Sequence, residues 1–156
     1  MEIRLAGKED LEGVALLLNE VTLDLQKRRI LQWEYPWDEK ALFKQQQSES
    51  LYVVVRDEEI IGTFCLSEID SINDLVVDKG SKYLAQLAII PAFQGRNVGS
   101  SITEFACDVA ERVNKSLYLD CWAGNGKLRA FYTKNGFACL GNFKEADYFI
   151  SVFRYN

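Results

Sequence analysis

The sequence contains no histidine among its 156 residues. This absence excludes any mechanism that uses a histidine base or a histidine metal ligand. None of the four cysteines belongs to a C-x-x-C pair, so we expect neither a structural zinc site nor another metal site. Cys65 and Cys121 fall in predicted strands and Cys107 in a predicted helix. We therefore expect free, mostly buried thiols, although the number of cysteines alone also allows paired disulfides.

The sequence also lacks long apolar runs and an excess of basic charge. No apolar stretch approaches the roughly 20 residues that cross a bilayer, and the segment MEIRLAGKED carries acidic residues where a signal peptide has its apolar part. We therefore expect a cytoplasmic protein with no membrane partner. The net charge of −5, from 18 basic and 23 acidic residues, argues against a nucleic-acid partner. No repeat, low-complexity tract or linker interrupts the chain, so we predict one domain over residues 1–156.

The most informative stretch runs from Lys82 to Gly99. Residues 83–90 are almost continuously apolar, which predicts a strand covered on both faces, and Pro91 ends its pairing because proline has no backbone N–H group. A turn follows at residues 94–99. Beyond it, apolar residues recur at helical spacing, namely Ile102, Phe105, Ala106, Val109, Ala110 and Val113. A loop rich in backbone N–H groups at a helix N-terminus binds anions, most often phosphate.

The turn differs from two common phosphate-binding loops, because residues 95–99, GRNVG, satisfy neither G-x-G-x-x-G nor G-x-x-x-x-G-K-[ST]. It resembles motif A of the GNAT superfamily of acetyl-CoA-dependent N-acetyltransferases, [QR]-x-x-G-x-[GA], which follows a buried strand. Gln94 and Gly99 match the first and last positions, while Asn97 stands in place of the middle glycine. Asparagine tolerates a positive φ better than other non-glycine residues, so we expect the turn to form.

A second motif follows further along the chain. Residues 125–137, NGKLRAFYTKNGF, closely resemble GNAT motif B, in which an asparagine precedes a helix that ends in F-Y-x-K-x-G-F. Two motifs in the family's order, with a strand between them, make the resemblance specific, and it covers essentially the whole chain. It implies an α/β (α+β) fold with a central mixed, mostly antiparallel sheet of about six to seven strands and about four flanking helices. It also implies a V-shaped splay between the central strands.

Local patterns predict the remaining elements. We expect strands at residues 2–6, 51–56, 60–67, 116–122, 137–140 and 148–153. We expect helices over residues 9–28 and from the N-cap Asp38 to about Gln47. Gly136 suits the C-terminal cap of the motif B helix. The polar segment 69–80 is predicted to be a loop before the central strand.

Residues 30–37, ILQWEYPW, form a loop that is unusually rich in aromatic residues. Its rings could close the bottom of the core or wall a small-molecule pocket. The resemblance favours the pocket, because in GNAT proteins the segment that links the first two helices commonly borders the acceptor site. It implies that Trp33, Glu34, Tyr35 and Trp37 bind the substrate, with Glu34 and Asp38 available to hold a cation.

The resemblance implies acetyl-CoA as co-substrate and direct transfer of its acetyl group to an amine in a ternary complex. Backbone groups of residues 87–89 would pair with the pantetheine arm, and one of their N–H groups would polarise the thioester carbonyl. The turn would hold the pyrophosphate with help from Arg96, while Asn125 would bind the cofactor from the opposite wall. The implied cofactor-binding residues are Leu87, Ala88, Ile89, Gln94, Gly95, Arg96, Asn97, Val98, Gly99, Ser100 and Asn125.

Tyr132 occupies the position of the family's general acid, where its phenol would protonate the departing CoA thiolate. The pattern alone would instead have Tyr132 pack on the helix face as an ordinary aromatic residue. Many family members carry a glutamate on the central strand, but here that position is Gln86, which cannot act as a base. The general base therefore stays open among Glu34, Glu68, Asp120 and a water relay.

We thus expect an acyltransferase that acetylates a primary amine, with a small molecule as the first hypothesis for the acceptor. The acidic, aromatic loop and the negative net charge suit a cationic acceptor. One alternative is a non-catalytic acyl-CoA-binding sensor, which the missing carboxylate at Gln86 favours. Another is a protein N-terminal or lysine acetyltransferase, which needs an open acceptor groove. The apolar C-terminal strand, residues 148–155, could pair across a homodimer.

Overall fold

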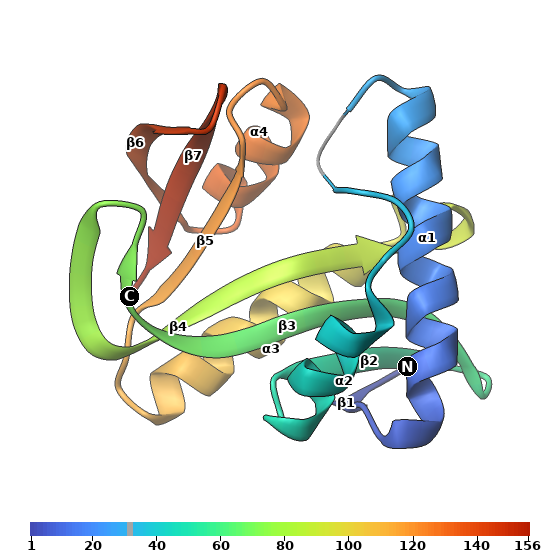
Figure 1. Cartoon of the computed structure of the whole chain (residues 1–156). Coiled ribbons are helices and arrows are strands. Elements are labelled where there is room, and N and C mark those ends of the chain that lie inside the picture. Colours follow the sequence, from blue (N-terminus) through green and yellow to red (C-terminus); the bar gives the residue numbers. More distant parts are fainter. Residues whose placement is uncertain (31–32) are drawn as a thin grey trace. The chain divides into compact units, whose positions relative to one another are not determined.

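The computed structural model describes residues 1–30 and 33–156, so Leu31 and Gln32 of the aromatic loop lie outside the described residues. The described residues form seven strands, four α-helices and two short 3₁₀ helices (Figure 1). The strands join one sheet in the order β1-β2-β3-β4-β5-β7-β6. The pairing of β4 with β5 is parallel, whereas β1–β2, β2–β3, β5–β7 and β6–β7 are antiparallel. This architecture confirms the predicted fold class.

Most helices and strands lie close to their positions predicted from the sequence, whereas β3, β4 and β6 are longer than predicted. The elements up to the central strand are β1 (Glu2–Leu5), η1 (Lys8–Asp10), α1 (Leu11–Lys27), α2 (Glu39–Gln47), β2 (Leu51–Arg56), β3 (Glu59–Ile72) and β4 (Leu75–Ile89). The later elements are η2 (Pro91–Phe93), α3 (Val98–Arg112), β5 (Leu117–Trp122), α4 (Gly126–Lys134), β6 (Ala138–Glu145) and β7 (Tyr148–Tyr155). Asp38 caps α2 as predicted, because its Oδ1 accepts a hydrogen bond from the Lys40 N–H at 2.9 Å.

The predicted loop at residues 69–80 is wrong, because this segment belongs to β3 and β4. The two strands meet at a tight turn in which Asn73 has a φ of 56°. The many polar residues of the segment hide an apolar set that packs with residues of β5 and β7. This set comprises Ile69, Ile72, Leu75 and Val77, in contact with the cluster around Tyr118, Ile150 and Val152. Contacts between residues distant in sequence therefore extend a hairpin that local composition does not indicate.

The central strand β4 is less covered than its apolar sequence predicts. Over residues 83–89 only Leu84 and Ala88 are fully buried, and the others are half-buried. The ladder between β4 and β5 comprises three residue pairs, from Lys82–Leu117 to Leu84–Leu119, and then ends although both strands continue. The expected splay of the central strands would begin at this point.

The chain divides into two compact units, Met1–Leu66 with Gln86–Ile102 and Ser67–Ala85 with Thr103–Asn156. In the first unit, α1 and α2 lie on one face of the β1–β3 strands (Figure 1), and their side chains bury a core that includes Leu18, Leu42 and Val53. The second unit has its own apolar cluster around Tyr118 and Val152. Both units contain residues of β3, β4 and α3. The single domain over residues 1–156 stays a prediction of the sequence analysis.

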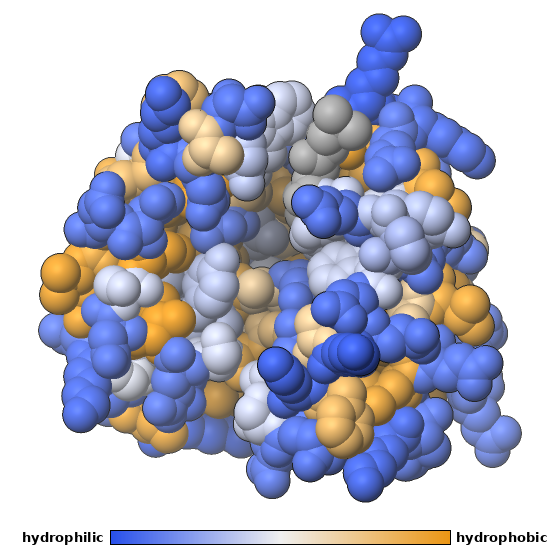
Figure 2. Space-filling view, in the orientation of Figure 1, coloured by the Kyte–Doolittle hydropathy of each residue, from blue (hydrophilic) through white to orange (hydrophobic). Residues whose placement is uncertain are grey.

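All four cysteines are free thiols, as expected. Cys65, Cys107 and Cys121 are buried, and burial raises their pKa values to about 12, 12 and 11 respectively, whereas Cys139 is exposed. Among the described helices, none is both long and apolar enough to span a bilayer. The face shown in Figure 2 is mostly hydrophilic, with apolar residues gathered in separate patches.

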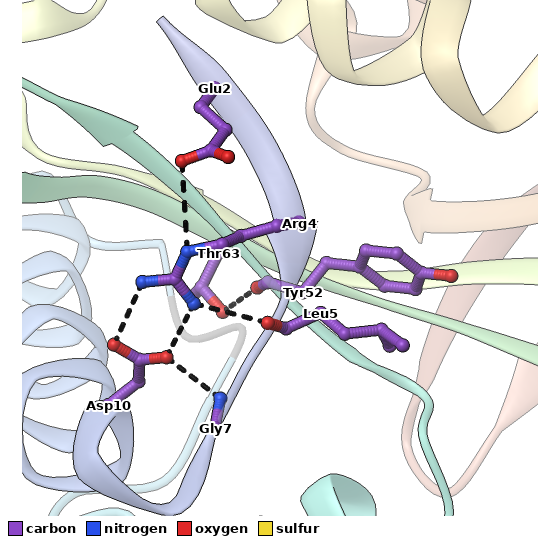
Figure 3. A network of polar contacts seen from close by, with 7 residues as sticks. All are labelled: Glu2, Arg4, Leu5, Gly7, Asp10, Tyr52 and Thr63. Atoms are coloured by element: carbon purple, nitrogen blue, oxygen red, sulfur yellow. Dashed lines mark hydrogen bonds and ion pairs between the residues drawn. The ribbon is translucent and has the colours of Figure 1, made fainter.

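A polar network fixes the start of the first unit (Figure 3). Asp10 accepts hydrogen bonds from Arg4 Nη1 at 2.7 Å and from the Gly7 backbone N–H at 2.8 Å. Arg4 lies on β1 and Asp10 just before α1, so the network ties the strand to the helix. The hydrogen bond from Arg4 is the main cause that lowers the pKa of Asp10, and it outweighs the effect of burial, which raises this pKa.

We predict that Asp10→Asn lowers the free energy of unfolding by about 1 to 2 kcal/mol, because it removes a charge-assisted hydrogen bond from a side chain that is 9% exposed. Denaturant unfolding measures the loss. The matched control is Asp24→Asn, which breaks the exposed pair with Arg28 and should cost less than about 0.5 kcal/mol.

The difference in unfolding free energy between wild type and Asp10→Asn should depend on pH. A carboxyl whose folded-state pKa is lowered stabilises the fold above its unfolded-state pKa of about 3.9, and this contribution is lost as the pH falls through the folded-state value. The gap between wild type and Asp10→Asn should therefore narrow below about pH 4. A gap that stayed constant from neutral pH down to strong acid would contradict the role given to the Asp10 charge.

Candidate active site

The turn that precedes α3 adopts the backbone predicted for an anion-binding loop. Gly95 and Asn97 both have left-handed conformations, with φ values of 76° and 65°. The Ser101 N–H donates to the Asn97 carbonyl oxygen at 3.1 Å, so helical hydrogen bonding starts at the turn itself. Residues 94–97 are exposed, whereas Val98 is buried and anchors the first turn of the helix. The positive end of the α3 dipole thus lies at an accessible loop.

Two arginines place positive charge next to this turn. The guanidinium carbon atoms of Arg96 and Arg56 lie 5.6 and 5.5 Å from the centre of the Phe93 ring, within the range of cation–π contacts. Arg56 ends β2 and is far from the turn in sequence, so no local pattern indicated its position. The contact restrains Arg96, which the sequence analysis assigned to the pyrophosphate.

Gln94, the first residue of motif A, has a structural contact that the motif alone did not predict. Its Nε2 donates a hydrogen bond of 2.9 Å to the Ile89 carbonyl oxygen at the end of β4. The same strand end is held by a bond of 3.0 Å from the Ile90 N–H to the Ile61 carbonyl oxygen of β3. The turn and the strand segment Leu87–Ile89, both predicted to bind the cofactor, are therefore tied together within the first unit.

Gln86 has a left-handed backbone inside β4, with a φ of 55°. Its side chain forms a reciprocal amide pair with Gln45 of α2, in which Gln45 Nε2 donates at 2.7 Å and Gln86 Nε2 donates at 3.1 Å. Gln86 Nε2 also lies 3.3 Å from the Cys65 sulfur. A left-handed residue breaks the regular alternation of a strand, as at a β-bulge. The carboxamide is fully engaged, which agrees with the prediction that Gln86 is not a base.

The two tryptophans of the aromatic loop pack against the core of the first unit. Trp33 and Trp37 contact each other edge to face, with ring centres 5.4 Å apart, and both contact the buried cluster. Trp37 Nε1 donates to Thr22 Oγ1 at 2.9 Å, and its backbone N–H donates to Asn19 Oδ1 at 2.8 Å. The two tryptophans therefore close the core, one of the two possibilities left open by the sequence. Glu34 and Tyr35 are exposed.

Helix α4 of the second unit carries the two site residues predicted from motif B. Asn125 is its N-cap, with Oδ1 accepting a bond of 3.1 Å from the Leu128 N–H. Tyr132 is 5% exposed, and its ring packs against Phe131, Phe137 and Phe153 at centre distances of 5.4 to 5.8 Å. Burial, and then the charges of neighbouring groups, raise the pKa of Tyr132. The phenol therefore keeps its proton at neutral pH.

The three carboxylates considered as bases differ in their surroundings. Glu34 is exposed, and the exposed Glu68 pairs with Lys82 at 3.2 Å. Asp120 is half-buried, and its Oδ2 accepts a hydrogen bond of 2.7 Å from Tyr83 Oη. Burial is the main cause that raises the pKa of Asp120, and the nearby charge of Glu145 adds to it. The surroundings of Asp120 therefore increase its affinity for a proton.

The predicted site residues fall into two sets, one in each unit. The first unit holds the motif A turn, the end of β4 and the aromatic loop, whereas the second holds Asn125, Tyr132 and Asp120. Sequence reasoning missed Arg56 and Tyr83, because their partners, Phe93 of η2 and Asp120 of β5, are distant in the sequence. In the part of the chain that the structure describes, no group of three or more acidic or cysteine side chains is placed to hold a metal ion.

Comparison with known proteins gives a family match. The model of the GNAT acetyltransferase family matches residues 19–137. No curated protein matches the sequence.

Many solved structures share the fold. One is a GNAT-family acetyltransferase from Streptococcus agalactiae, with a TM-score of 0.82 and 16% identity over 98% of this chain and 93% of that one. A second is the ribosomal-protein-S18-alanine N-acetyltransferase from Escherichia coli, with a TM-score of 0.71 and 17% identity over 98% and 91% of the two chains. A third is the PaiA N-acetyltransferase from Thermoplasma acidophilum in complex with coenzyme A, with a TM-score of 0.73 and 18% identity over 99% and 98%.

The left-handed backbone of Asn97 leads to a stability prediction. Asn97→Ala should lower the free energy of unfolding by about 1 kcal/mol, because a side chain with no local hydrogen bonding strains this conformation. Asn97→Gly, the matched control, should remain within about 0.5 kcal/mol of wild type because glycine has no such strain. Thermal or denaturant unfolding measures both variants. An alanine variant as stable as the glycine variant would contradict the left-handed turn.

Proposed function

Because the chain belongs to the GNAT acetyltransferase family and is an acyltransferase, we propose that it transfers an acetyl group from acetyl-CoA to a primary amine of a small molecule. The observation that carries this proposal is the motif A turn, in which Gly95 and Asn97 have the left-handed backbone that the loop requires. An acetyltransferase also needs a proton donor, and Tyr132 at the matching position of motif B retains its proton at neutral pH.

The proposed cofactor site begins at the turn. The pyrophosphate of acetyl-CoA would bind residues 95–100, where the α3 dipole and the Arg96 side chain favour negative charge. Arg56, whose guanidinium group also lies over the Phe93 ring, adds a second cation beside this loop. The residues present therefore fit the phosphate end of the cofactor, and the space beside Gly95 is open, because a Cβ atom added there would meet no atom within 4 Å.

The pantetheine arm would pair with the backbone of Leu87, Ala88 and Ile89, as an added strand does. Two features hold this segment in place, the Gln94 bond to the Ile89 carbonyl and the close approach of Gly62. A Cβ atom at residue 62 would lie 3.2 Å from the Ala88 carbonyl oxygen, so a larger residue there would push on the segment. A backbone N–H held this firmly can polarise a thioester carbonyl as its oxygen gains charge.

In the proposed reaction, the neutral amine attacks the thioester carbonyl carbon, a C–N bond forms and the C–S bond breaks. Tyr132 donates its phenolic proton to the sulfur, and the proton lost by the amine leaves through the general base or water. The raised pKa of Tyr132 keeps the donor protonated but also makes it a weaker acid. The same buried surroundings raise the proton affinity of a thiolate, so the transfer does not become more unfavourable.

A second candidate function is a sensor that binds acyl-CoA without turnover. The engagement of Gln86 with Gln45 and Cys65 favours it, because no carboxylate stands at that position of β4. We place either activity in the cytoplasm, and the four free thiols support a reducing compartment. A homodimer and a protein acceptor also remain proposals of the sequence analysis, and neither is supported by a further contact.

The cofactor site is tested by calorimetric titration of acetyl-CoA. Wild type should bind, and Gly99→Glu should weaken binding at least about 100-fold, because its carboxylate repels the pyrophosphate at close range. Gln47→Glu is the matched control, since it adds the same charge at an exposed position of α2 and should leave binding unchanged. Absence of binding by folded wild type that carries no CoA would refute the proposal.

Tyr132→Phe separates the enzyme from the sensor. It should lower the acceptor-dependent release of CoA about 100-fold while the affinity for acetyl-CoA stays constant, because only the proton donor is lost. Turnover is measured over a panel of primary amines. Tyr155→Phe, which removes a hydroxyl bonded to Glu111, is the matched control and should keep full turnover. Equal turnover in both variants would assign Tyr132 to packing alone.

A further inference from the structure

A cavity of about 210 Å³ lies within the second unit. Side chains from five strands contribute to its wall, which combines an apolar part with carboxyl and hydroxyl groups. The apolar part consists of Ile69, Ile72 and Ile150, and the polar part includes Tyr83, Asp120 and Glu145. The wall therefore offers hydrocarbon surface and negative charge to the same occupant.

The negative charge of this cavity has no ion-pair partner among the residues that the structure describes. Asp120 is half-buried and accepts its hydrogen bond from the neutral phenol of Tyr83. Among the described residues, no lysine or arginine forms an ion pair with Asp120 or Glu145. Both burial and the Glu145 charge raise the pKa of Asp120. Placing an anion away from water without a cation costs free energy, and a bound cation would offset that cost.

We propose that this cavity binds an aliphatic diamine as the acetyl acceptor, with one ammonium group held by Asp120 and Glu145 and the methylene chain against the isoleucines. The inference rests on the proposed function, whose substrate class it names. A volume of about 210 Å³ holds roughly seven water-sized groups at about 30 Å³ each. A four-carbon diamine, with about six non-hydrogen atoms, is of this size.

The electrostatic coupling within the second unit links the cavity to the proposed proton donor. The charge of Asp120 contributes to the raised pKa of Tyr132, and Tyr132 in turn contributes to the raised pKa of Tyr83. The charges of Glu145 and Asp120 also contribute to the raised pKa of Tyr148. An ammonium group bound at Asp120 would offset a negative charge that raises the pKa of the Tyr132 phenol. The ammonium group that the carboxylates hold stays charged, so the other amine of the diamine is the one free to react.

Other occupants fit this wall less well. An anion would be repelled by the two carboxylates. A monoamine would bring one positive charge against two negative ones and, once held there, would have no second amine to accept the acetyl group. A small metal ion would make no use of the isoleucines. The combination of a negative wall with an apolar one thus favours a ligand that carries two cationic groups on a hydrocarbon chain.

The test is calorimetric titration with 1,4-diaminobutane and, as a monocation of the same chain length, butylamine, at low ionic strength. Wild type should bind the diamine at least about tenfold more tightly than butylamine. Asp120→Asn should weaken diamine binding at least about tenfold, and Glu145→Gln should weaken it several-fold because Glu145 is exposed. Asparagine has the shape of aspartate and can still accept the Tyr83 hydrogen bond, so we expect the fold to persist.

Asp108→Asn is the matched control, because Asp108 is an exposed aspartate of α3 in the same unit and is absent from the cavity wall. It should leave diamine affinity within about twofold of wild type. An equal loss in Asp120→Asn and Asp108→Asn would reduce the effect to net charge and overturn the inference. Failure to bind the diamine by protein that binds acetyl-CoA would overturn it too, while leaving the proposed function intact. The diamine titration contains no cofactor, so its result does not depend on acetyl-CoA binding. Absence of acetyl-CoA binding would refute the proposed function.

Discussion

The irregular backbone of β4 determines where this strand leaves its regular pairing. Its ladder with β5 ends after Leu84, and two residues later Gln86 takes a left-handed conformation. Such a conformation costs a residue with a side chain about 1 to 2 kcal/mol. The paired carboxamides of Gln45 and Gln86, together with the Cys65 sulfur, offset this cost from within the first unit. Helix α2 therefore maintains an irregular strand whose backbone is proposed to bind the cofactor.

A second free-energy cost arises at Asp120, which belongs to the second unit. A half-buried carboxylate that accepts its hydrogen bond from a phenol is less stable than one paired with an arginine, and the raised pKa of Asp120 reflects this difference. The pKa of Asp10 is shifted in the opposite direction, because the Arg4 guanidinium lowers the pKa of its carboxyl. One aspartate thus serves the fold, whereas the other remains available to a ligand. Strain and unmatched charge of this kind concentrate at functional sites.

Structural features that depend on neighbouring residues could be predicted from the sequence, whereas contacts between residues distant in the sequence could not. The two motifs, the Asp38 cap and the left-handed Asn97 depend on a few consecutive residues, and each could be predicted. The hairpin at residues 69–80 could not, because its apolar side chains gain their partners on β5 and β7. The Tyr83–Asp120 bond joins residues 37 positions apart, and the Gln45–Gln86 pair joins residues 41 apart. No local sequence pattern indicates contacts over such separations. The sequence therefore predicted residues of the candidate site but not the contacts that support them.

The two places that could recognise a cationic acceptor differ in how strongly they would act. In the aromatic loop, Trp33 and Trp37 are taken up by the core, so Glu34 remains as an exposed charge. An exposed ion pair is screened by water and salt and contributes about 0 to 1 kcal/mol. At Asp120 the carboxylate is half-buried beside Tyr83, where a charge interacts more strongly because less water surrounds it. If the acceptor is a cation, we therefore expect Asp120 to contribute more to its binding than the exposed Glu34 does.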